Sequence, residues 1–264
     1  MPTLYTLPMS HYCEAARWSL EAAGVAFTEA AYLPGLHMAM SPVAKLRKKG
    51  TPPADFTGKD TSMPLLVGDD GKILAYDTWQ CISRLDGQPS ARAKELCDTV
   101  LGPCTRTIAY SHLLIKTQGA DAAFMRACTP SRVPRMQRWV MSISGFRRTV
   151  KGKMYENMVR SDAYVEECRT KLRAAFTELE PLLAEPPYAG PRPTAAGVAL
   201  AALAAPMVLP PGFGSSFYGM PMLELESLPT AMQEEVAEWR RTPVGAWVLK
   251  YYETHRGAAP AASG

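Results

Sequence analysis

The sequence lacks the clustered cysteine and histidine residues from which protein metal sites are built. It contains only four histidines, and its six cysteines follow no paired spacing and form no C-x-x-C motif. Zinc sites require such residues at close spacings, so we expect no metal ion. Scattered cysteines of this kind are typical of a reducing compartment, and we therefore expect free thiols.

Long apolar runs and an excess of charge of one sign are also absent. The longest apolar run, from Val198 to Leu209, contains Pro206 and is too short to span a bilayer. The chain has 29 basic and 25 acidic residues and no dense basic stripe, which argues against binding to nucleic acid. The opening MPTLYTLPM has none of the regions of a signal peptide. We expect a cytoplasmic protein, or an organellar one if a presequence has been removed.

The first part of the chain alternates between strand and helix patterns. Short apolar or alternating segments predict strands at 3–7, 25–32, 64–67 and 72–75. Helical periodicity predicts helices at 13–23 and 78–85, and the stretch 33–60 is expected to be irregular. This order, β-α-β followed by β-β-α, predicts a compact α/β domain over residues 1–87.

The remainder of the chain has helical periodicity almost throughout. Proline and glycine separate predicted helices near 91–117, 121–145, 155–184, 194–206, 229–240 and 242–255. We therefore expect an all-helical domain over residues 91–256, joined to the first domain by a short linker. The final segment, 257–264, is expected to be a flexible tail.

Three segments together resemble the cytosolic glutathione transferases, specifically serine-type members like those of bacteria and algae. They are LYTLPMSHYCEAARWSLEAAGV at 4–25, SMPLLVGDDGKILAYDTW at 62–79 and YAGPRPTAAGVALAALAAP at 188–206. The resemblance implies a thioredoxin-like N-terminal domain followed by a helical-bundle C-terminal domain. It also implies glutathione as co-substrate, a small hydrophobic electrophile as acceptor, a homodimer and a role in detoxification.

Ser10 is the candidate catalytic residue, between the first strand and the first helix. A free thiol has a pKa of about 8.5, and lowering it by about two units requires roughly 2.7 kcal/mol. One hydrogen bond to a charged acceptor supplies on the order of 1.5–3 kcal/mol, so a single hydroxyl is sufficient. The resemblance implies the same role, whereas the alternative is a residue that only caps the helix.

Other side chains near Ser10 offer different chemistry. Cys13 completes an S-x-x-C sequence that lacks the first thiol of a redox motif, so we expect it to pack within the helix. Tyr5 and Tyr12 are alternative hydroxyl donors, and Tyr12 is also a candidate for the acceptor pocket. We favour Ser10 because its position matches the serine-type arrangement.

The resemblance further implies a glutathione site. Met63 would precede a cis-proline, Pro64, and pair its backbone with the cysteinyl part of the tripeptide, the alternative being an ordinary trans bond. Thr78 would contact the γ-glutamyl carboxylate and Asp77 its ammonium group, unless both only cap a helix. Lys45, in a basic run, would neutralise the glycine carboxylate, or would belong to a solvated charged face.

The second domain carries the candidate acceptor pocket. Arg106 and Tyr110 lie four residues apart on its first long helix, in the region that lines this pocket in the family. Packing in the core is the alternative for such side chains. Thr194 matches the hydroxyl residue of a capping motif at the sixth helix of the family, but Gly197 stands where relatives carry aspartate. We expect the reciprocal capping bond to be lost, at a cost of roughly 0.5–2 kcal/mol.

The leading hypothesis is therefore an enzyme that conjugates the thiolate of glutathione to a hydrophobic electrophile. A non-catalytic binding or scaffold subunit with the same fold is one alternative. A glutathione-dependent thiol oxidoreductase is another, although it would need a reactive cysteine at the position of Ser10.

Overall fold

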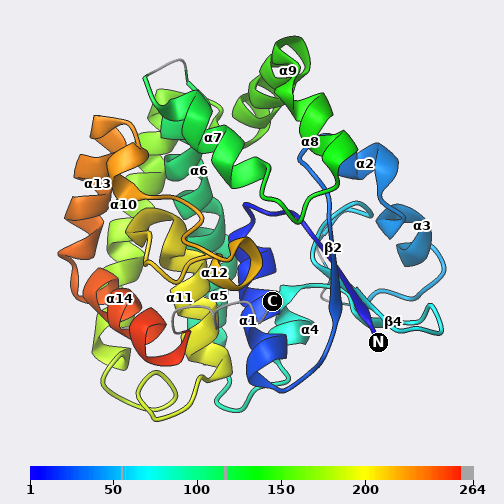
Figure 1. The fold of residues 1–264 in the computed structure, drawn as a ribbon. Helices are drawn as coiled ribbons and strands as arrows, with labels where there is room; N and C mark the ends of the chain where they lie inside the picture. The colour runs from blue at the N-terminus through cyan, green and yellow to red at the C-terminus, as the bar shows by residue number, and fades with distance from the viewer. Residues whose placement is uncertain (55, 57, 116–117, 257–264) are drawn as a thin grey trace.

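The computed structural model describes residues 1–54, 56, 58–115 and 118–256 (Figure 1). The predicted flexible tail, 257–264, lies outside these residues. The described chain forms an α/β part that contains the strands and a helical part that follows it.

A four-stranded sheet is the centre of the α/β part in the described chain. Its strands lie in the order β2-β1-β3-β4. β1 and β2 are parallel, whereas β1 with β3 and β3 with β4 are antiparallel. A helix, α1, connects β1 to β2, and α4 follows β4. These connections define a thioredoxin-like arrangement, made of β1 (Thr3–Thr6), α1 (His11–Ala22), β2 (Thr28–Ala31), β3 (Leu65–Val67), β4 (Ile73–Ala75) and α4 (Thr78–Ile82).

Apolar side chains of the strands attach these helices to the sheet. Leu4 and Leu66 are fully buried against Ala16 and Leu20 of α1 and against Cys81 of α4. Each side chain fully buried in this way contributes about 1.5–3 kcal/mol. The two helices consequently lie together on one face of the sheet.

The stretch predicted to be irregular contains two short helices. They are α2 (Leu36–Met40) and α3 (Val43–Arg47), and the prediction was wrong at this point. Gly35 precedes α2 with a φ of 81°, a conformation that glycine adopts without penalty. A helix of five residues is too short to display an apolar period, so the sequence pattern missed both.

The helical part is organised around one buried helix, α11. Every one of its side chains is buried, since its sequence AAGVALAALAAPMV contains no polar residue. α1, α6 and α14 pack against it, so it joins the two parts of the chain. The elements are α5 (Ala91–Leu96), the π-helical turn η1 (Cys97–Leu101), α6 (Gly102–Leu113), α7 (Ala120–Cys128), α8 (Arg135–Ser142), α9 (Ser144–Met154), the π-helical turn η2 (Tyr155–Val159), α10 (Asp162–Leu179), the 3₁₀ turn η3 (Glu180–Leu182), α11 (Ala195–Val208), α12 (Ser215–Tyr218), the 3₁₀ turn η4 (Leu225–Ser227), α13 (Thr230–Arg240) and α14 (Pro243–His255).

Two of the predicted long helices are divided in the structure. The segment 121–145 contains α7, α8 and the start of α9. Pro130 and Pro134 interrupt the helical hydrogen bonds between α7 and α8. The segment 155–184 is interrupted at Arg160, whose φ is 65°. α10 then begins after Ser161, whose side chain accepts a hydrogen bond from the backbone N–H of Tyr164 at 3.2 Å.

The N-terminus of α11 corrects a further prediction. The Thr194 hydroxyl accepts a hydrogen bond from the Gly197 N–H at 3.1 Å, as expected for a cap. Gly197 cannot make the reciprocal bond, as expected, but the Thr194 N–H is not left unpaired, because the Tyr251 hydroxyl of α14 accepts it at 3.0 Å. A side chain at position 197 would overlap this tyrosine ring. Tyr251 therefore takes the part of the missing aspartate and requires glycine opposite it.

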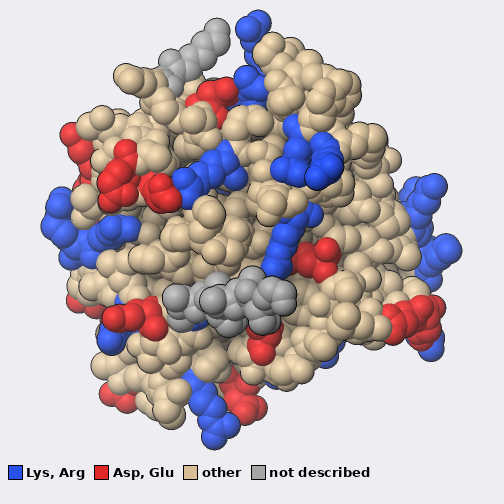
Figure 2. All heavy atoms as spheres, viewed as in Figure 1, with Lys and Arg blue, Asp and Glu red and all other residues tan. Residues whose placement is uncertain are grey.

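The described helices do not include one that is both long and apolar enough to cross a membrane. The described residues also contain no group of three or more acidic, cysteine or histidine side chains suited to a metal ion. Figure 2 shows acidic and basic side chains intermixed on one face of the molecule, with wide uncharged areas between them.

Candidate functional site

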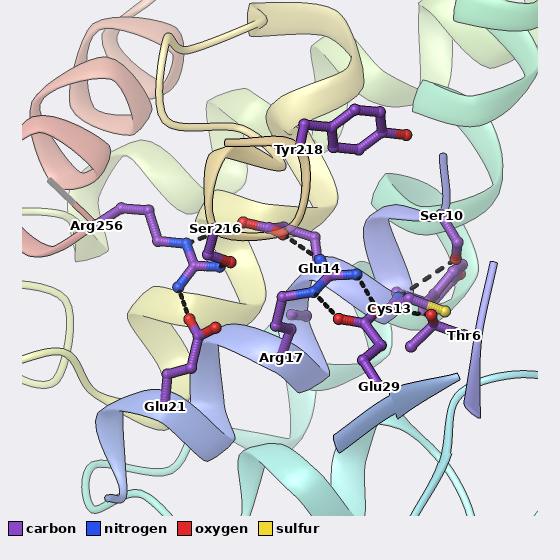
Figure 3. A network of polar contacts seen from close by, with 12 residues as sticks. Thr6, Ser10, Cys13, Glu14, Arg17, Glu21, Glu29, Ser216, Tyr218 and Arg256 are labelled. Carbon is purple, nitrogen blue, oxygen red and sulfur yellow. Dashed lines mark hydrogen bonds and ion pairs between the residues drawn. The ribbon is translucent and has the colours of Figure 1, made fainter. Parts of the chain in front are cut away.

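Ser10 lies at the N-terminus of α1, immediately after β1. Its half-buried side chain accepts a hydrogen bond from the Cys13 N–H at 3.3 Å, so it caps the helix (Figure 3). The N-terminus of α1 offers backbone N–H groups and the positive end of the helix dipole at this point. A hydroxyl that accepts one hydrogen bond still has a proton to donate, so capping and catalysis are compatible. The catalytic role of Ser10 stays a prediction.

Cys13 packs inside the protein, as expected. Its side chain is fully buried, and its sulfur accepts the Leu7 N–H at 3.4 Å. Burial raises the pKa of this thiol to about 11, against the smaller opposing effects of hydrogen bonds from Leu7 and Ser10. The thiol is therefore protonated at neutral pH, which disfavours the oxidoreductase alternative. All six cysteines, each within the described chain, are buried and free.

The turn before β3 has the geometry that the resemblance implied. The Met63–Pro64 peptide bond is cis, as predicted. Within the described chain, neither the N–H nor the carbonyl of Met63 has a hydrogen-bond partner. An extended peptide could thus pair with this backbone as an added strand does.

Arg47 holds this turn in place, a role that the sequence pattern missed. Its Nη2 donates to the carbonyl oxygens of Ser62, Pro64 and Tyr76 at 2.9, 3.2 and 2.6 Å. The guanidinium lies inward, 4.5 Å from the centre of the Phe56 ring. The basic run is therefore not one uniform solvated face, because Arg47 joins the cis-proline turn to the start of α4.

The start of α4 lies against α1. Asp77 caps α4 by accepting the Gln80 N–H at 2.9 Å. Thr78 is buried, and its hydroxyl donates to the Tyr12 carbonyl at 3.1 Å. The predicted segments around Ser10, Pro64 and Thr78 are therefore linked through hydrogen bonds of their neighbours.

Lys45 is not linked to these segments by any contact among the described residues. Its side chain is exposed on α3, whereas Arg47 on the same helix is buried. A part for Lys45 in binding stays a prediction.

An apolar cavity adjoins the residues on either side of Ser10. Its enclosed space is small, about 20 Å³ and enough for a water-sized group, within about 370 Å³ of empty space that includes open solvent, and it lies between the start of α1, α6 and the segment after α11. Its walls are formed by Met9, His11, Arg106, Ala109, Tyr110, Leu113, Ala127, Pro206, Leu209, Phe213, Met222, Leu223 and Met232. The candidates Arg106 and Tyr110 thus line it, whereas Tyr12 does not and instead contacts Gly102.

His11 is a member of this cavity that sequence reasoning missed. It is buried, and its Nε2–H donates to the Gly102 carbonyl at 2.9 Å. Burial and then the positive charge of Arg106 lower the pKa of His11 to about 3. The imidazole is consequently neutral at physiological pH. The one feature of the sequence that could have indicated a place for His11 near the site is its position directly after Ser10.

A buried network of charges fixes the helix that carries Ser10 (Figure 3). Arg17 of α1 contacts Glu14 at 2.6 Å and Glu29 of β2 at 2.6 Å. Glu14 also contacts Arg256, just beyond α14, at 3.0 Å. The network joins α1, β2 and the end of α14, so the orientation of α1 depends on segments far apart in the sequence.

No family model and no curated protein matches the chain. Its fold is similar to that of the beta-etherase LigF from Sphingobium sp. strain SYK-6, at 13% identity and a TM-score of 0.49, over 94% of this chain and 98% of the other. A glutathione transferase family member from Pseudomonas fluorescens Pf-5 with bound glutathione is 14% identical, with a TM-score of 0.48, over 98% and 99% of the two chains. A glutathione S-transferase from Xanthobacter autotrophicus Py2 is 16% identical, with a TM-score of 0.45, over 96% and 93%.

The fold class is established by the strand order and connections of the chain itself. A thioredoxin-like α/β part precedes a helical part, which confirms the fold that the resemblance to glutathione transferases implied. The activity does not follow from the fold and has to be argued from the site.

Proposed function

We propose that the protein binds glutathione between the start of α1, the cis-proline turn and the start of α4, and conjugates it to a small hydrophobic electrophile. The observation that carries this proposal is the backbone of Met63, whose N–H and carbonyl have no partner in the described chain. In this proposal the two groups pair with the cysteinyl part of the tripeptide. Its sulfur would then lie near the N-terminus of α1, where the hydroxyl of Ser10 and the helix dipole favour a thiolate.

The remaining contacts follow from the same placement. Asp77 and Thr78, at the N-terminus of α4, would hold the γ-glutamyl group, and Lys45 the glycine carboxylate. Ser10 would donate a hydrogen bond to the sulfur and form no covalent bond. With an aryl chloride, a carbon–sulfur bond forms, the carbon–chlorine bond breaks and chloride leaves with the bonding electrons.

The wider expectations belong to the same proposal. They are the division into domains 1–87 and 91–256, a homodimer, a cytoplasmic location and a part in detoxification.

Ser10→Ala tests the proposal, with Ser161→Ala as a matched control. Both serines cap a helix by accepting a backbone N–H, at 3.3 and 3.2 Å, so both variants lose a cap. Only Ser10→Ala removes the proposed donor to the thiolate. A hydrogen bond to a charged group contributes about 1.5–3 kcal/mol, so we expect kcat/KM with 1-chloro-2,4-dinitrobenzene to fall by about 10- to 150-fold. Ser161→Ala should leave it unchanged.

A non-catalytic binding protein is the second candidate. In this candidate Ser10 only caps α1, by accepting the Cys13 N–H. Retention of the wild type on immobilised glutathione, without conjugation, would support this candidate. If the protein is not retained and no conjugation occurs at millimolar glutathione, both candidate functions are overturned.

A further inference from the structure

Arg106 is a charged side chain for which the described chain provides no partner. It lies on α6 and lines the apolar cavity beside Ser10. Its Nε atom is buried without a hydrogen bond, and no ion pair with any described residue involves it. Arg106 as a whole is only partly buried, and leaving a partly desolvated charge without a partner is costly, so such a group is a favourable place for an anion.

The surroundings of Arg106 strengthen this attraction. Among the described residues that form the cavity wall none is acidic, and besides Arg106 the polar ones are His11 and Tyr110. His11 already donates its Nε2–H to the Gly102 carbonyl, and it is neutral at physiological pH. Tyr110 is buried, and burial raises the pKa of its hydroxyl, so it carries no negative charge. The cavity therefore combines one uncompensated positive charge with an apolar wall.

We propose that this cavity selects electrophiles in which a carboxylate is attached to an apolar body, the carboxylate pairing with Arg106. A guanidinium binds a carboxylate through two parallel hydrogen bonds, and this pairing is stronger where water is excluded. The apolar body contacts side chains such as Met9 and Leu113. The inference rests on the proposed function, because Met9 and His11 adjoin Ser10 and so place the cavity beside the proposed thiolate.

Binding of unreactive compounds tests the cavity without requiring catalysis. Calorimetric titration with 4-nitrobenzoate and with the uncharged 4-nitrobenzamide compares the affinities of two compounds that have a similar shape and differ in charge. We expect the benzoate to bind at least about 10-fold more tightly, since a charged hydrogen bond contributes about 1.5–3 kcal/mol. Arg106→Met should remove this preference while leaving the amide unaffected, and Arg106→Lys should retain part of it. Arg148→Met, which removes an exposed arginine on α9 that is not in the cavity wall, is the matched control.

Equal affinity of the wild type for the two compounds would overturn the inference. A preference that survives in Arg106→Met, in protein whose circular dichroism spectrum and thermal midpoint match the wild type, would also overturn it. If Arg106→Met does not fold, Arg106→Lys and the wild-type comparison still decide the outcome.

Conjugation separates this inference from the proposed function. The reactive pair is 4-chloro-3-nitrobenzoate and the uncharged 1-chloro-2,4-dinitrobenzene. We expect Arg106→Met to lower kcat/KM for the benzoate relative to the neutral chloride by about 10- to 150-fold. An unchanged ratio in an active enzyme refutes the inference and leaves the function standing. Arg106-dependent binding of 4-nitrobenzoate without conjugation of either chloride refutes the function and leaves the anion site standing.

Discussion

Replacing Tyr251 by phenylalanine tests how the N-terminus of α11 is held. The Tyr251 hydroxyl accepts the Thr194 N–H at 3.0 Å, in place of the aspartate that a capping box would provide. Tyr251→Phe keeps the ring, which is stacked on Trp247 with the ring centres 4.6 Å apart, and removes only this acceptor. The Thr194 N–H is then left without a partner at a half-buried position.

The expected loss follows from the cost of one unsatisfied donor. Leaving a buried polar group unpaired costs about 1–3 kcal/mol, and the lower half of that range applies to a half-buried position, so we expect about 1–2 kcal/mol. For a protein of this size, each kcal/mol lowers the thermal midpoint by roughly 2–4 °C, which gives a shift of about 2–8 °C. Urea unfolding followed by circular dichroism measures the free energy, and thermal melting measures the midpoint.

Tyr252→Phe is the matched control for this measurement. Tyr252 is the next residue of α14, and its buried hydroxyl has no hydrogen-bond partner among the described residues. Removing an unpaired buried hydroxyl should leave the stability unchanged or raise it. A loss in Tyr251→Phe no larger than that in Tyr252→Phe would refute the role assigned to the Tyr251 hydroxyl. Gly197→Asp should destabilise the wild type, since its side chain would overlap Tyr251.

Two further predictions concern buried charged and titratable groups. The pKa of His11 is lowered from 6.5 to about 3 in the fold, so the unfolded chain takes up a proton first as the pH falls below 6.5. As the pH falls, the contribution of His11 to the free energy of unfolding should therefore decline by up to about 1.4 kcal/mol per pH unit. In His11→Gln, the free energy of unfolding measured with urea should depend less on pH between about pH 6.5 and pH 5. The same pH dependence in the variant and the wild type would contradict this. Glu29→Gln leaves the buried Arg17 with one carboxylate fewer and should cost about 3–5 kcal/mol. Lys250→Met, which breaks an exposed pair with Glu253, should have no measurable effect on the free energy of unfolding. Equal losses of stability in Glu29→Gln and Lys250→Met would refute the expected difference between buried and exposed ion pairs.

Much of the fold follows from local sequence patterns. The strand at 3–6, the helix after Ser10 and the hairpin before Asp77 are visible because period, caps and turn residues all act over a few neighbours. The two short helices near Gly35 were missed because five residues display no period. Pro130 and Pro134 were visible in the sequence, and they break a helix that the longer-range pattern had joined.

The candidate site could be predicted only in part. The caps at Ser10 and Asp77 and the cis bond before Pro64 could be predicted because each stands at an element boundary with a distinctive residue type, whereas their roles in binding and catalysis stay predictions. The inward position of Arg47 and the neutral state of His11 could not be predicted, because both depend on segments distant in sequence. The carbonyls of Ser62 and Tyr76 turn one arginine of a basic run away from solvent.

The sequence by itself determined the order of the elements, the position of the caps and the residue types available for chemistry, because these depend on near neighbours along the chain. Tertiary structure alone decided which charges distant in the sequence are paired. It brought Tyr251 to the N-terminus of α11 and Arg256 to Glu14, and it left Arg106 facing an apolar cavity whose described wall residues include no acid. The physical reason is that pairing and burial depend on distance in space, which local patterns do not encode.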